Sequence, residues 1–421
     1  MLDISYIREN LELVKKSVKA KKSPVDIDEL LKLDDSRRQL ILKVDGLRST
    51  RNSAAKDQDI EAGKKVKEEL DGLEKQLGSV EREWQKLMYQ VPNIPLGDVP
   101  EGDASNYQVL KKEGKITKFA FTPKDHIELG EMLGIIDIPR AAKVSGSRFA
   151  YLTGQGVILE LALVQFAMEA LMKEGFVPVI PPALIKKDIT EGLGYWHGGG
   201  NENYYFVRDY ELEGDEKGQP LDLYLIGTGE HAVVPMHSNE VLDEQALPKK
   251  YAAFSPSFRR EAGSYGQDTK GILRVHQFDK VELVEFVKPE EDETERRKML
   301  SIVEGFMKSL KLPYRVIKLA SGDLSFPAAE TIDIETWIPS QEQYRETHSI
   351  STTTDFQARG LNIKYGATLG SKYVHILNGT AFAIGRMIIA ILENFQTAEG
   401  SVKIPEVLQR YTGFSEITPK K

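Results

Sequence analysis

The stretch SFRREAGSYGQDTKGILRVHQFDKVELVEF (residues 257–286) decides the fold. It predicts two strands joined by a long loop that contains glycine. Alternate side chains share one face of a strand, so Arg259 and Glu261 should project together on the first strand, and Phe278, Lys280 and Glu282 on the second. Such a face offers a guanidinium for phosphate, a ring for stacking and carboxylates for amino groups. Ordinary cross-strand charge pairs would give the same pattern.

Further strand-like runs surround this stretch and are separated by few helices. We expect strands at 176–185, 221–228, 251–261, 280–287 and 372–379, and helices at 156–174, 294–310 and 380–395. This order predicts an antiparallel sheet flanked by helices, so the fold class is α+β rather than doubly wound.

The amino-terminal part of the chain has a different pattern. Residues 1–22 predict one short amphipathic helix, and apolar residues then recur at alternating three- and four-residue steps through 30–47 and again through 66–91. Two heptad helices joined near 54–59 would form an antiparallel coiled-coil arm. Basic residues lie near its tip: Arg48, Arg51, Lys56, Lys64 and Lys65. Mixed charge of this kind also fits a solvated face or a dimerisation coil.

A linker rich in proline and glycine follows the arm. The segment VPNIPLGDVPEG (91–102) favours a connection over an element of secondary structure. We therefore expect an amino-terminal helical domain with its linker at 1–102 and a second domain at 103–421.

Composition excludes several chemistries. The chain of 421 residues contains no cysteine, so a metal would have to bind oxygen or histidine. The formal net charge of −8 argues against broad nonspecific binding of nucleic acid. The amino terminus lacks the order of a signal peptide and no run of about 18 apolar residues is evident, so we expect a cytoplasmic protein without a membrane segment.

Three shorter motifs add polar residues at predicted element ends. LIGTGE (225–230) carries Thr228 and Glu230 in alternation, RETHSIS (345–351) offers Glu346 and Ser349 as oxygen ligands, and HILNGTAFAIGRMIIAILENFQ (375–396) carries Arg386. Each motif alone also fits an ordinary structural role, such as a buried helix with one satisfied arginine.

Taken together, the chain resembles a bacterial-type seryl-tRNA synthetase, a class II aminoacyl-tRNA synthetase. FRREAGSYGQDTKGILRVHQFDKVE resembles the second class II motif in its serine-specific form, and NGTAFAIGRMIIAILENFQ resembles the third. KEGFVPVIPPAL resembles the first motif, with Pro182 at the characteristic position of a dimer-interface strand. The likeness runs over essentially the whole chain.

The resemblance implies a serine–tRNA ligase that uses ATP and Mg²⁺. Arg259 would hold the α-phosphate and Arg386 the γ-phosphate as the catalytic pair, Phe278 would stack on adenine, Glu261 would accept from its amine, and Glu346 with Ser349 would bind the metal. The full set of implied ATP-binding residues is Arg259, Arg260, Glu261, Val275, Phe278, Glu346, Thr347, His348, Ser349 and Arg386.

The resemblance also implies the amino acid and the RNA partner. Serine would be selected by Thr228, Gly229, Glu230, Arg259, Glu282, Asn378 and Thr380. A site that satisfies the substrate hydroxyl rejects alanine because its own polar group is otherwise left unpaired. The arm would contact tRNA(Ser), and also tRNA(Sec), through Arg48, Arg51, Lys56, Lys64 and Lys65, and the first motif implies a homodimer.

Some residues depart from the family pattern. Gly229 stands where alanine is usual, Thr380 replaces a common serine, and the loop GLGYWHGGGNENYYF (192–206) is unusual and favours a mobile cover or a plain connection. Two alternatives compete with the ligase: a noncatalytic tRNA-binding paralogue, and a ligase that charges a carrier protein. The first expects loss of Arg259, Arg386 or Glu346, and the second expects no full arm.

Overall fold

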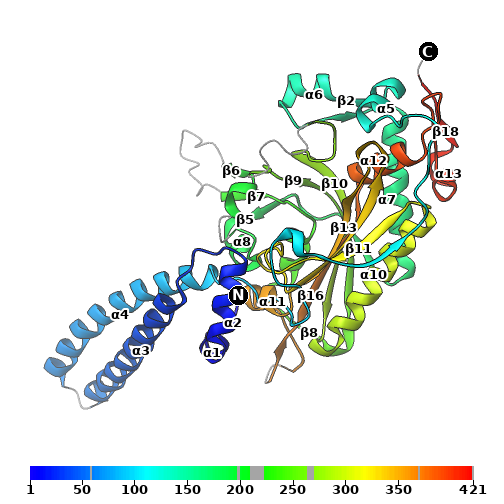
Figure 1. Cartoon of the computed structure of the whole chain (residues 1–421). Coiled ribbons are helices and arrows are strands. Elements are labelled where there is room, and N and C mark those ends of the chain that lie inside the picture. The colour runs from blue at the N-terminus through cyan, green and yellow to red at the C-terminus, as the bar shows by residue number, and fades with distance from the viewer. Residues whose placement is uncertain (57–58, 197–199, 209–221, 263–269, 368–369, 420–421) are drawn as a thin grey trace. The chain divides into compact units, whose positions relative to one another are not determined.

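The chain forms two compact units, Met1–Ile94 and Pro95–Lys421, in a computed structural model (Figure 1). The structure describes residues 1–56, 59–196, 200–208, 222–262, 270–367 and 370–419. Residues 57–58 of the turn expected near 54–59, Leu221 of an expected strand, and residues 263–269 of the central stretch lie outside the described residues.

The first unit contains the expected helical hairpin. Helices α3 (Ile27–Lys56) and α4 (Ile60–Tyr89) pack side by side. Arg37 lies 3.4 Å from Glu81, and its guanidinium also lies 4.5 Å from the centre of the Trp84 ring. Several of the periodic apolar residues are buried: Leu30, Leu40, Val44 and Leu70. The apolar seam therefore pairs these two helices, as its spacing predicted.

The single helix expected at 1–22 is wrong. The segment forms two helices, α1 (Ile4–Glu9) and α2 (Leu11–Ala20), which are separated by Asn10. Asn10 has a nonhelical backbone, and its side-chain amide donates to the carbonyl of Tyr6 at 3.0 Å. Asparagine side chains compete in this way with helical hydrogen bonds. The periodicity remained in phase across the break, so the sequence pattern did not reveal it.

The second unit is built on a sheet of eight strands among the described residues, in the order β1-β11-β12-β13-β16-β10-β9-β4. Neighbouring strands are antiparallel except for β4 and β9, which are parallel. The bounds are β1 (Gln108–Glu113), β11 (Tyr314–Lys318), β12 (Glu330–Ile338), β13 (Gln343–Thr352), β16 (His375–Ala383), β10 (Gln277–Val287), β9 (Lys249–Phe258) and β4 (Val177–Val179). The α+β fold is confirmed.

Short sheets and helices complete this unit. The short strands are β2 (Ile136–Asp137), β3 (Tyr151–Leu152), β5 (Leu184–Lys186), β6 (Phe206–Arg208), β7 (Asp222–Leu225), β8 (Val241–Leu242), β14 (Lys364–Tyr365), β15 (Lys372–Tyr373), β17 (Val402–Lys403) and β18 (Glu416–Ile417). The helices are α5 (His126–Leu133), α6 (Ile138–Ser145), α7 (Gln155–Lys173), α8 (Lys187–Leu193), α9 (Glu230–Val233), α10 (Asp292–Ser309), α11 (Phe356–Leu361), α12 (Ile384–Asn394) and α13 (Glu406–Thr412).

One face of the large sheet is covered by α7, α10 and α12. Phe166 of α7, Phe306 of α10 and Phe382 of β16 meet there, with ring centroids 5.2–6.2 Å apart. By length and composition, α7 is the one helix in the described part of the chain that could cross a membrane. Its contacts with α12, α13 and β16 are those of a core helix.

Strand β10 divides its side chains between two apolar clusters. Val281 and Leu283 point into the cluster formed with α7 and α10, whereas Val284 and Phe286 join a second cluster that includes residues of α8, α9 and α11. Lys280 and Glu282 have the same parity as this second set. Lys280 and Glu282 therefore lie on the face opposite the α7 layer.

The third motif begins as a strand and only later becomes a helix. β16 continues through Ala383 because its end pairs with β10, where Lys280 faces Ala383 and Glu282 faces Thr380. The helix expected from residue 380 therefore starts at Ile384, and Arg386 lies in its first turn. A bulge between Val281 and Glu282 sets this register.

Candidate active site

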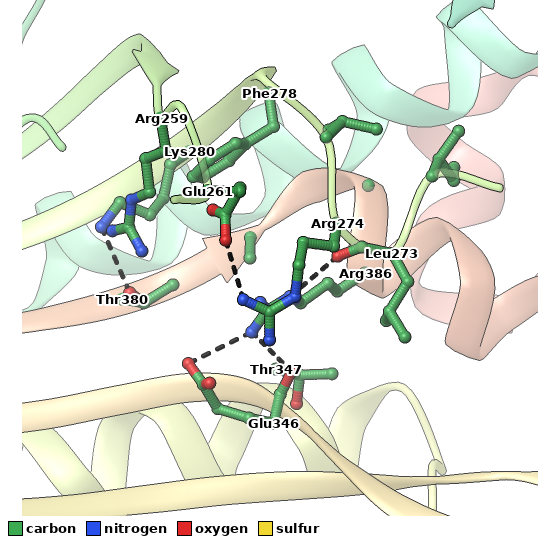
Figure 2. A pocket seen from close by; sticks show the side chains of 14 residues that line it. Arg259, Glu261, Leu273, Arg274, Phe278, Lys280, Glu346, Thr347, Thr380 and Arg386 are labelled. Carbon is green, nitrogen blue, oxygen red and sulfur yellow. Dashed lines mark hydrogen bonds and ion pairs between the residues drawn. The ribbon is translucent and has the colours of Figure 1, made fainter. Parts of the chain in front are cut away.

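A pocket opens on the polar face of β10, and Figure 2 shows its lining. Its residues come from the second motif, from β13 and from the β16–α12 junction. The lining residues are Arg259, Glu261, Ile272, Leu273, Arg274, Val275, Phe278, Lys280, Glu346, Thr347, Thr380, Ala383, Gly385 and Arg386.

The two arginines expected to hold phosphates line this common pocket (Figure 2). Nε of Arg259 donates to the carbonyl of Gly227 at 3.1 Å, and its guanidinium carbon lies 5.5 Å from the centre of the Phe278 ring. Nε of Arg386 donates to the carbonyl of Leu273 at 3.4 Å. Each guanidinium is thus anchored to a backbone carbonyl oxygen at the edge of the pocket.

Glu346 lies next to Arg386 at the pocket wall. Nη1 of Arg386 donates to the Glu346 carbonyl at 3.0 Å and lies 3.2 Å from its Oε1. Burial acts to raise the pKa of Glu346, but the guanidiniums of Arg386 and Arg259 outweigh it and lower the pKa. The side chain is therefore an anion at neutral pH, as a metal ligand must be.

Glu261 reaches the pocket by a route that strand alternation did not predict. β9 ends at Phe258, and Glu261 has a left-handed backbone with φ of 52°. Its Oε2 accepts a hydrogen bond from Nη1 of Arg274 at 2.7 Å (Figure 2). The turn after the strand, and not a shared strand face, brings Glu261 beside Arg259.

The remaining residues expected to bind ATP or metal are more dispersed. Val275 and Thr347 line the pocket, whereas Arg260 is exposed. His348 is buried against Phe382, 5.8 Å away between ring centroids, and burial lowers the pKa of His348 to about 3. His348 is not among the pocket-lining residues.

Ser349 shares a strand with Glu346. It lies opposite Asp333 of β12, in a register shifted by a bulge near Glu346. Asp333 is buried and its Oδ1 has no hydrogen-bond partner in the described part of the chain. This corner of the site therefore contains carboxylate and hydroxyl oxygens.

Of the residues expected to bind serine, Arg259 and Thr380 line the pocket, and Glu282 is hydrogen-bonded to Thr380. Thr228 and Asn378 are buried, and in the described part of the chain Oγ1 of Thr228 and Nδ2 of Asn378 have no hydrogen-bond partner. At Gly229, a Cβ atom would lie 3.0 Å from Cβ of Ala253 and 3.4 Å from Cβ of Glu282. Buried polar groups without partners indicate a place for a polar ligand.

Glu230 is fixed by two residues that sequence reasoning missed. Nε2 of Gln357 donates to its Oε1 at 2.7 Å, and the Tyr195 hydroxyl donates at 3.0 Å to Oε2. Burial raises the pKa of Glu230 to about 7 despite these bonds. Tyr195 belongs to the unusual loop 192–206, of which 197–199 lie outside the described residues. No sequence signal links Gln357 to Glu230.

Glu282 is held by Lys280 and Thr380 on the pocket side of the sheet. Oγ1 of Thr380 donates to its Oε2 at 3.3 Å, and the ammonium group of Lys280 forms an ion pair with that oxygen. Lys280 and Thr380 both line the pocket. Glu282 is therefore connected to the pocket that contains the two arginines, and strand alternation had already placed Lys280 beside it.

The five basic residues expected to contact tRNA are exposed on α3 and α4. One of them, Arg48, forms a salt bridge with Glu74 at 2.8 Å. Exposure leaves these side chains accessible to a polyanion, but it is also what a solvated helix face would give.

The sheet, the three motifs and the shared pocket define the core of a class II aminoacyl-tRNA synthetase. The family model for the tRNA synthetase class II core domain (G, H, P, S and T) matches residues 210–395. The model for the seryl-tRNA synthetase N-terminal domain matches residues 1–95. The second match contradicts the expectation of a carrier-protein ligase without the arm.

Relatives match the chain over its length. It is 42% identical to the serine–tRNA ligase of Borreliella afzelii, with 99% of each chain covered, and 39% identical to that of Dictyoglomus turgidum, with 100% of each covered. The crystal structure of seryl-tRNA synthetase from Pyrococcus horikoshii complexed with ATP matches with a TM-score of 0.90, 39% identity and 100% of each chain covered. The chain belongs to the seryl-tRNA synthetase family, and it is a ligase.

Proposed function

We propose that the chain activates L-serine with ATP to seryl-adenylate and then transfers the seryl group to the 3′ end of tRNA(Ser). One observation carries this proposal: Arg259 and Arg386 line the same pocket, which leads through Thr380 to the buried carboxylate of Glu282. Phosphate-binding cations and a carboxylate for a small polar substrate are thereby joined in one site.

In the activation step, an oxygen of serine's carboxylate attacks the α-phosphorus of ATP, and the bond to the β-phosphate breaks to release pyrophosphate. Arg259 stabilises the charge that builds on the α-phosphate, so its contribution grows in the transition state. Arg386 holds the γ-phosphate. Phe278 stacks on adenine, and the carboxylate of Glu261 accepts from the adenine amine. Oε2 of Glu261 also accepts a hydrogen bond from Nη1 of Arg274.

The tRNA reaction needs no protein nucleophile. A hydroxyl of the terminal ribose attacks the carbonyl carbon of seryl-adenylate, and AMP leaves with the bonding electrons. Since the adenylate is already activated, positioning of the two substrates provides the main contribution. The same transfer to tRNA(Sec) is part of the proposal.

Serine is selected by the buried polar groups beside the pocket. Glu230 accepts from the substrate's amino group, together with Thr228, and Glu282 accepts from the substrate hydroxyl. Thr380 and Asn378 complete the polar wall, and Gly229 leaves space for the ligand. Alanine would leave Glu282 without a partner, which is a strong basis for rejection.

Mg²⁺ would be held by Glu346 and Ser349. In the described ranges, no group of three or more histidine and carboxylate side chains forms a metal cage. One carboxylate and one hydroxyl still fit Mg²⁺, because this ion commonly binds few protein ligands and takes the rest from phosphates and water. When bound, the ion would supply charge neutralisation on the phosphates.

The exposed basic residues of the arm are proposed to bind the RNA backbone. Phosphate contacts position a nucleic acid without reading its sequence, which suits recognition of tRNA shape by Arg48, Arg51, Lys56, Lys64 and Lys65. Division of the chain into an arm with its linker at 1–102 and a catalytic domain at 103–421 remains part of this proposal. A cytoplasmic location suits an enzyme that consumes ATP and tRNA.

A homodimer is proposed from the surface of the catalytic unit. Apolar side chains are exposed on α7 and on the segment of β4 and its continuation, which resembles the first class II motif: Val157, Ile158, Leu161, Met172, Val177 and Ile180. Leu161 is 54% exposed and Ile180 is 83% exposed. Exposed apolar side chains gathered on two neighbouring elements are typical of an interface between subunits.

The test of the proposed function is ATP–pyrophosphate exchange with purified protein and each of the twenty amino acids, without tRNA. Serine alone should support rapid exchange, and charging of tRNA(Ser) should follow when RNA is added. No exchange with any amino acid would overturn the catalytic proposal and favour the noncatalytic tRNA-binding protein. Exchange with a different amino acid would overturn only the assignment of the substrate pocket.

A further inference from the structure

Two polar side chains, those of Lys280 and Thr380, converge on one oxygen of Glu282. Lys280 forms an ion pair with Oε2, and Oγ1 of Thr380 donates to the same oxygen at 3.3 Å. Nζ of Lys280 also lies 3.5 Å from Oγ1 of Thr380. In the described part of the chain these contacts all fall on Oε2. The other carboxylate oxygen, Oε1, is thereby the one left for a ligand.

Lys280 is in an unusual place for an ammonium group. It is 4% exposed, and Glu282 beside it is 3% exposed. Burial lowers the pKa of Lys280, while the charge of Glu282 acts in the opposite direction. Buried charges generally require a partner and further hydrogen bonds, and both are provided here by Glu282 and Thr380. Yet Lys280 also lines the pocket, next to Arg259 and Phe278 (Figure 2).

The alternation of β10 explains how Lys280 reaches Glu282. The two residues are separated by Val281, so their side chains leave the same face of the strand. The bulge that follows Val281 sets Thr380 of β16 opposite Glu282. The backbone therefore fixes both donors relative to the carboxylate, without help from a flexible loop.

We propose that Lys280 is a positioning residue for substrate selection, which occupies Oε2 of Glu282 and so presents Oε1 to the hydroxyl group of the amino acid. This inference rests on the proposed binding of serine by Glu282. Lys280 acts through the carboxylate and makes no contact with the serine hydroxyl. Its contribution is therefore confined to substrates that carry a hydroxyl group.

A half-buried lysine beside two carboxylates provides a control. Lys250 of β9 lies 3.5 Å from Oε2 of Glu285, its cross-strand partner on β10, and 2.5 Å from Oε2 of Glu295 on α10. This cluster also pairs a lysine of the sheet with a carboxylate on β10, but its residues do not line the pocket. A lysine that served only to stabilise the sheet would behave alike at both positions.

The decisive measurement compares serine with alanine. ATP–pyrophosphate exchange is measured for wild type, Lys280→Met and Lys250→Met, with KM and kcat for serine, alanine and ATP. In Lys280→Met we expect the KM for serine to rise at least about tenfold and the serine-to-alanine ratio of kcat/KM to fall by a similar factor. The KM for ATP should change by less than about twofold. Lys250→Met should leave the ratio unchanged.

Two further variants separate positioning from structure. Lys280→Arg keeps the charge and should recover part of the serine-to-alanine ratio. In a Glu282→Gln background, Lys280→Met should cause little additional loss, because groups that act through one another are not additive. If Lys280→Met does not fold, Lys280→Gln retains a donor without the charge and gives the same test.

The outcomes distinguish this inference from the proposed function. Absence of serine-dependent exchange in the wild type would overturn both. Normal wild-type exchange with an unchanged serine-to-alanine ratio in the Lys280 variants would overturn this inference alone. A rise in the KM for ATP equal to that for serine, or full additivity with Glu282→Gln, would also overturn it, since Lys280 would then act on the nucleotide.

Discussion

Arg386 and Glu346 come from different motifs, and one nitrogen of Arg386 bonds to Glu346 twice. Nη1 of Arg386 donates to the backbone carbonyl of Glu346 at 3.0 Å and lies 3.2 Å from its carboxylate oxygen Oε1. The residue proposed to hold the γ-phosphate is thus paired with the residue proposed to hold Mg²⁺.

The first prediction concerns the metal. Glu346→Gln removes the anionic ligand but keeps the size of the side chain, so half-maximal exchange should need at least about fivefold more Mg²⁺. The control is Glu342→Gln, an exposed position in the turn immediately before the same strand. A magnesium titration of exchange measures both variants. Identical titration curves for Glu346→Gln and wild type would remove Glu346 from the metal site.

The second prediction concerns charge in the transition state. Arg259→Ala should lower exchange at least tenfold with the fold intact, which corresponds to ~1.4 kcal/mol or more of transition-state stabilisation. The control is Arg297→Ala, an exposed arginine on α10 outside the pocket. Circular dichroism establishes folding. Exchange at the wild-type rate in Arg259→Ala would refute the assigned role.

The third prediction is a pH dependence. Burial raises the pKa of Glu230 to about 7, and only its ionised form can accept from the substrate's amino group. Hence kcat/KM for serine should rise as pH increases through about 7. Hydrogen bonds to the ionised carboxylate favour ionisation. Removing the Tyr195 hydroxyl in Tyr195→Phe should therefore move the rise in kcat/KM to higher pH.

The matched control for the pH profile is Tyr224→Phe. Tyr224 belongs to the same aromatic cluster, with its ring 5.6 Å from that of Trp196. The Tyr224→Phe substitution should leave unchanged the pH at which kcat/KM for serine rises. A profile that is flat from pH 6 to 8 in wild type, or equally displaced in both variants, would contradict control by Glu230.

The fourth prediction separates the two units. Deleting residues 30–90 removes nearly the whole arm. It should reduce tRNA charging to about a few per cent or less, while the rate of pyrophosphate exchange stays close to that of the wild type. Replacing Arg51, Lys56, Lys64 and Lys65 together by alanine should weaken charging in a salt-dependent manner. Parallel loss of exchange and charging on deletion would mean that the arm serves the catalytic fold.

The fifth prediction concerns assembly. Leu161→Asp places a charge on the exposed apolar surface of α7 and should convert a dimer to a monomer, because burying an unpaired charge at an interface is unfavourable. Leu42→Asp, an exposed leucine on α3, is the control. Sedimentation velocity measures the mass of each variant. A monomeric wild type would contradict the proposed dimer directly.

Local patterns in the sequence predicted much of the fold. The repeated leucines of α3 and α4 required a partner for one apolar seam, and the alternation along β10 placed Lys280 and Glu282 on one face. These features depend on near neighbours in the chain. The periods of helix and strand are short, so they can be read without knowing the tertiary contacts.

Element ends were less well predicted. The chain turns after Phe258 and Glu261 adopts a left-handed backbone, while β16 continues through Ala383 before α12 begins. Pairing with β10 determines how far β16 extends. Competition between a strand and a helix at such a junction depends on a partner strand that is distant in sequence.

The sequence by itself determined the family of motifs, the helical arm and the residues on each strand face, because each follows from residue type and short spacing. Only the tertiary structure decided which carboxylate oxygens accept hydrogen bonds from other side chains. Gln357 meets Glu230 across 127 residues, and Thr380 meets Glu282 across 98. Such pairs are created by strand register and packing, which no local period encodes.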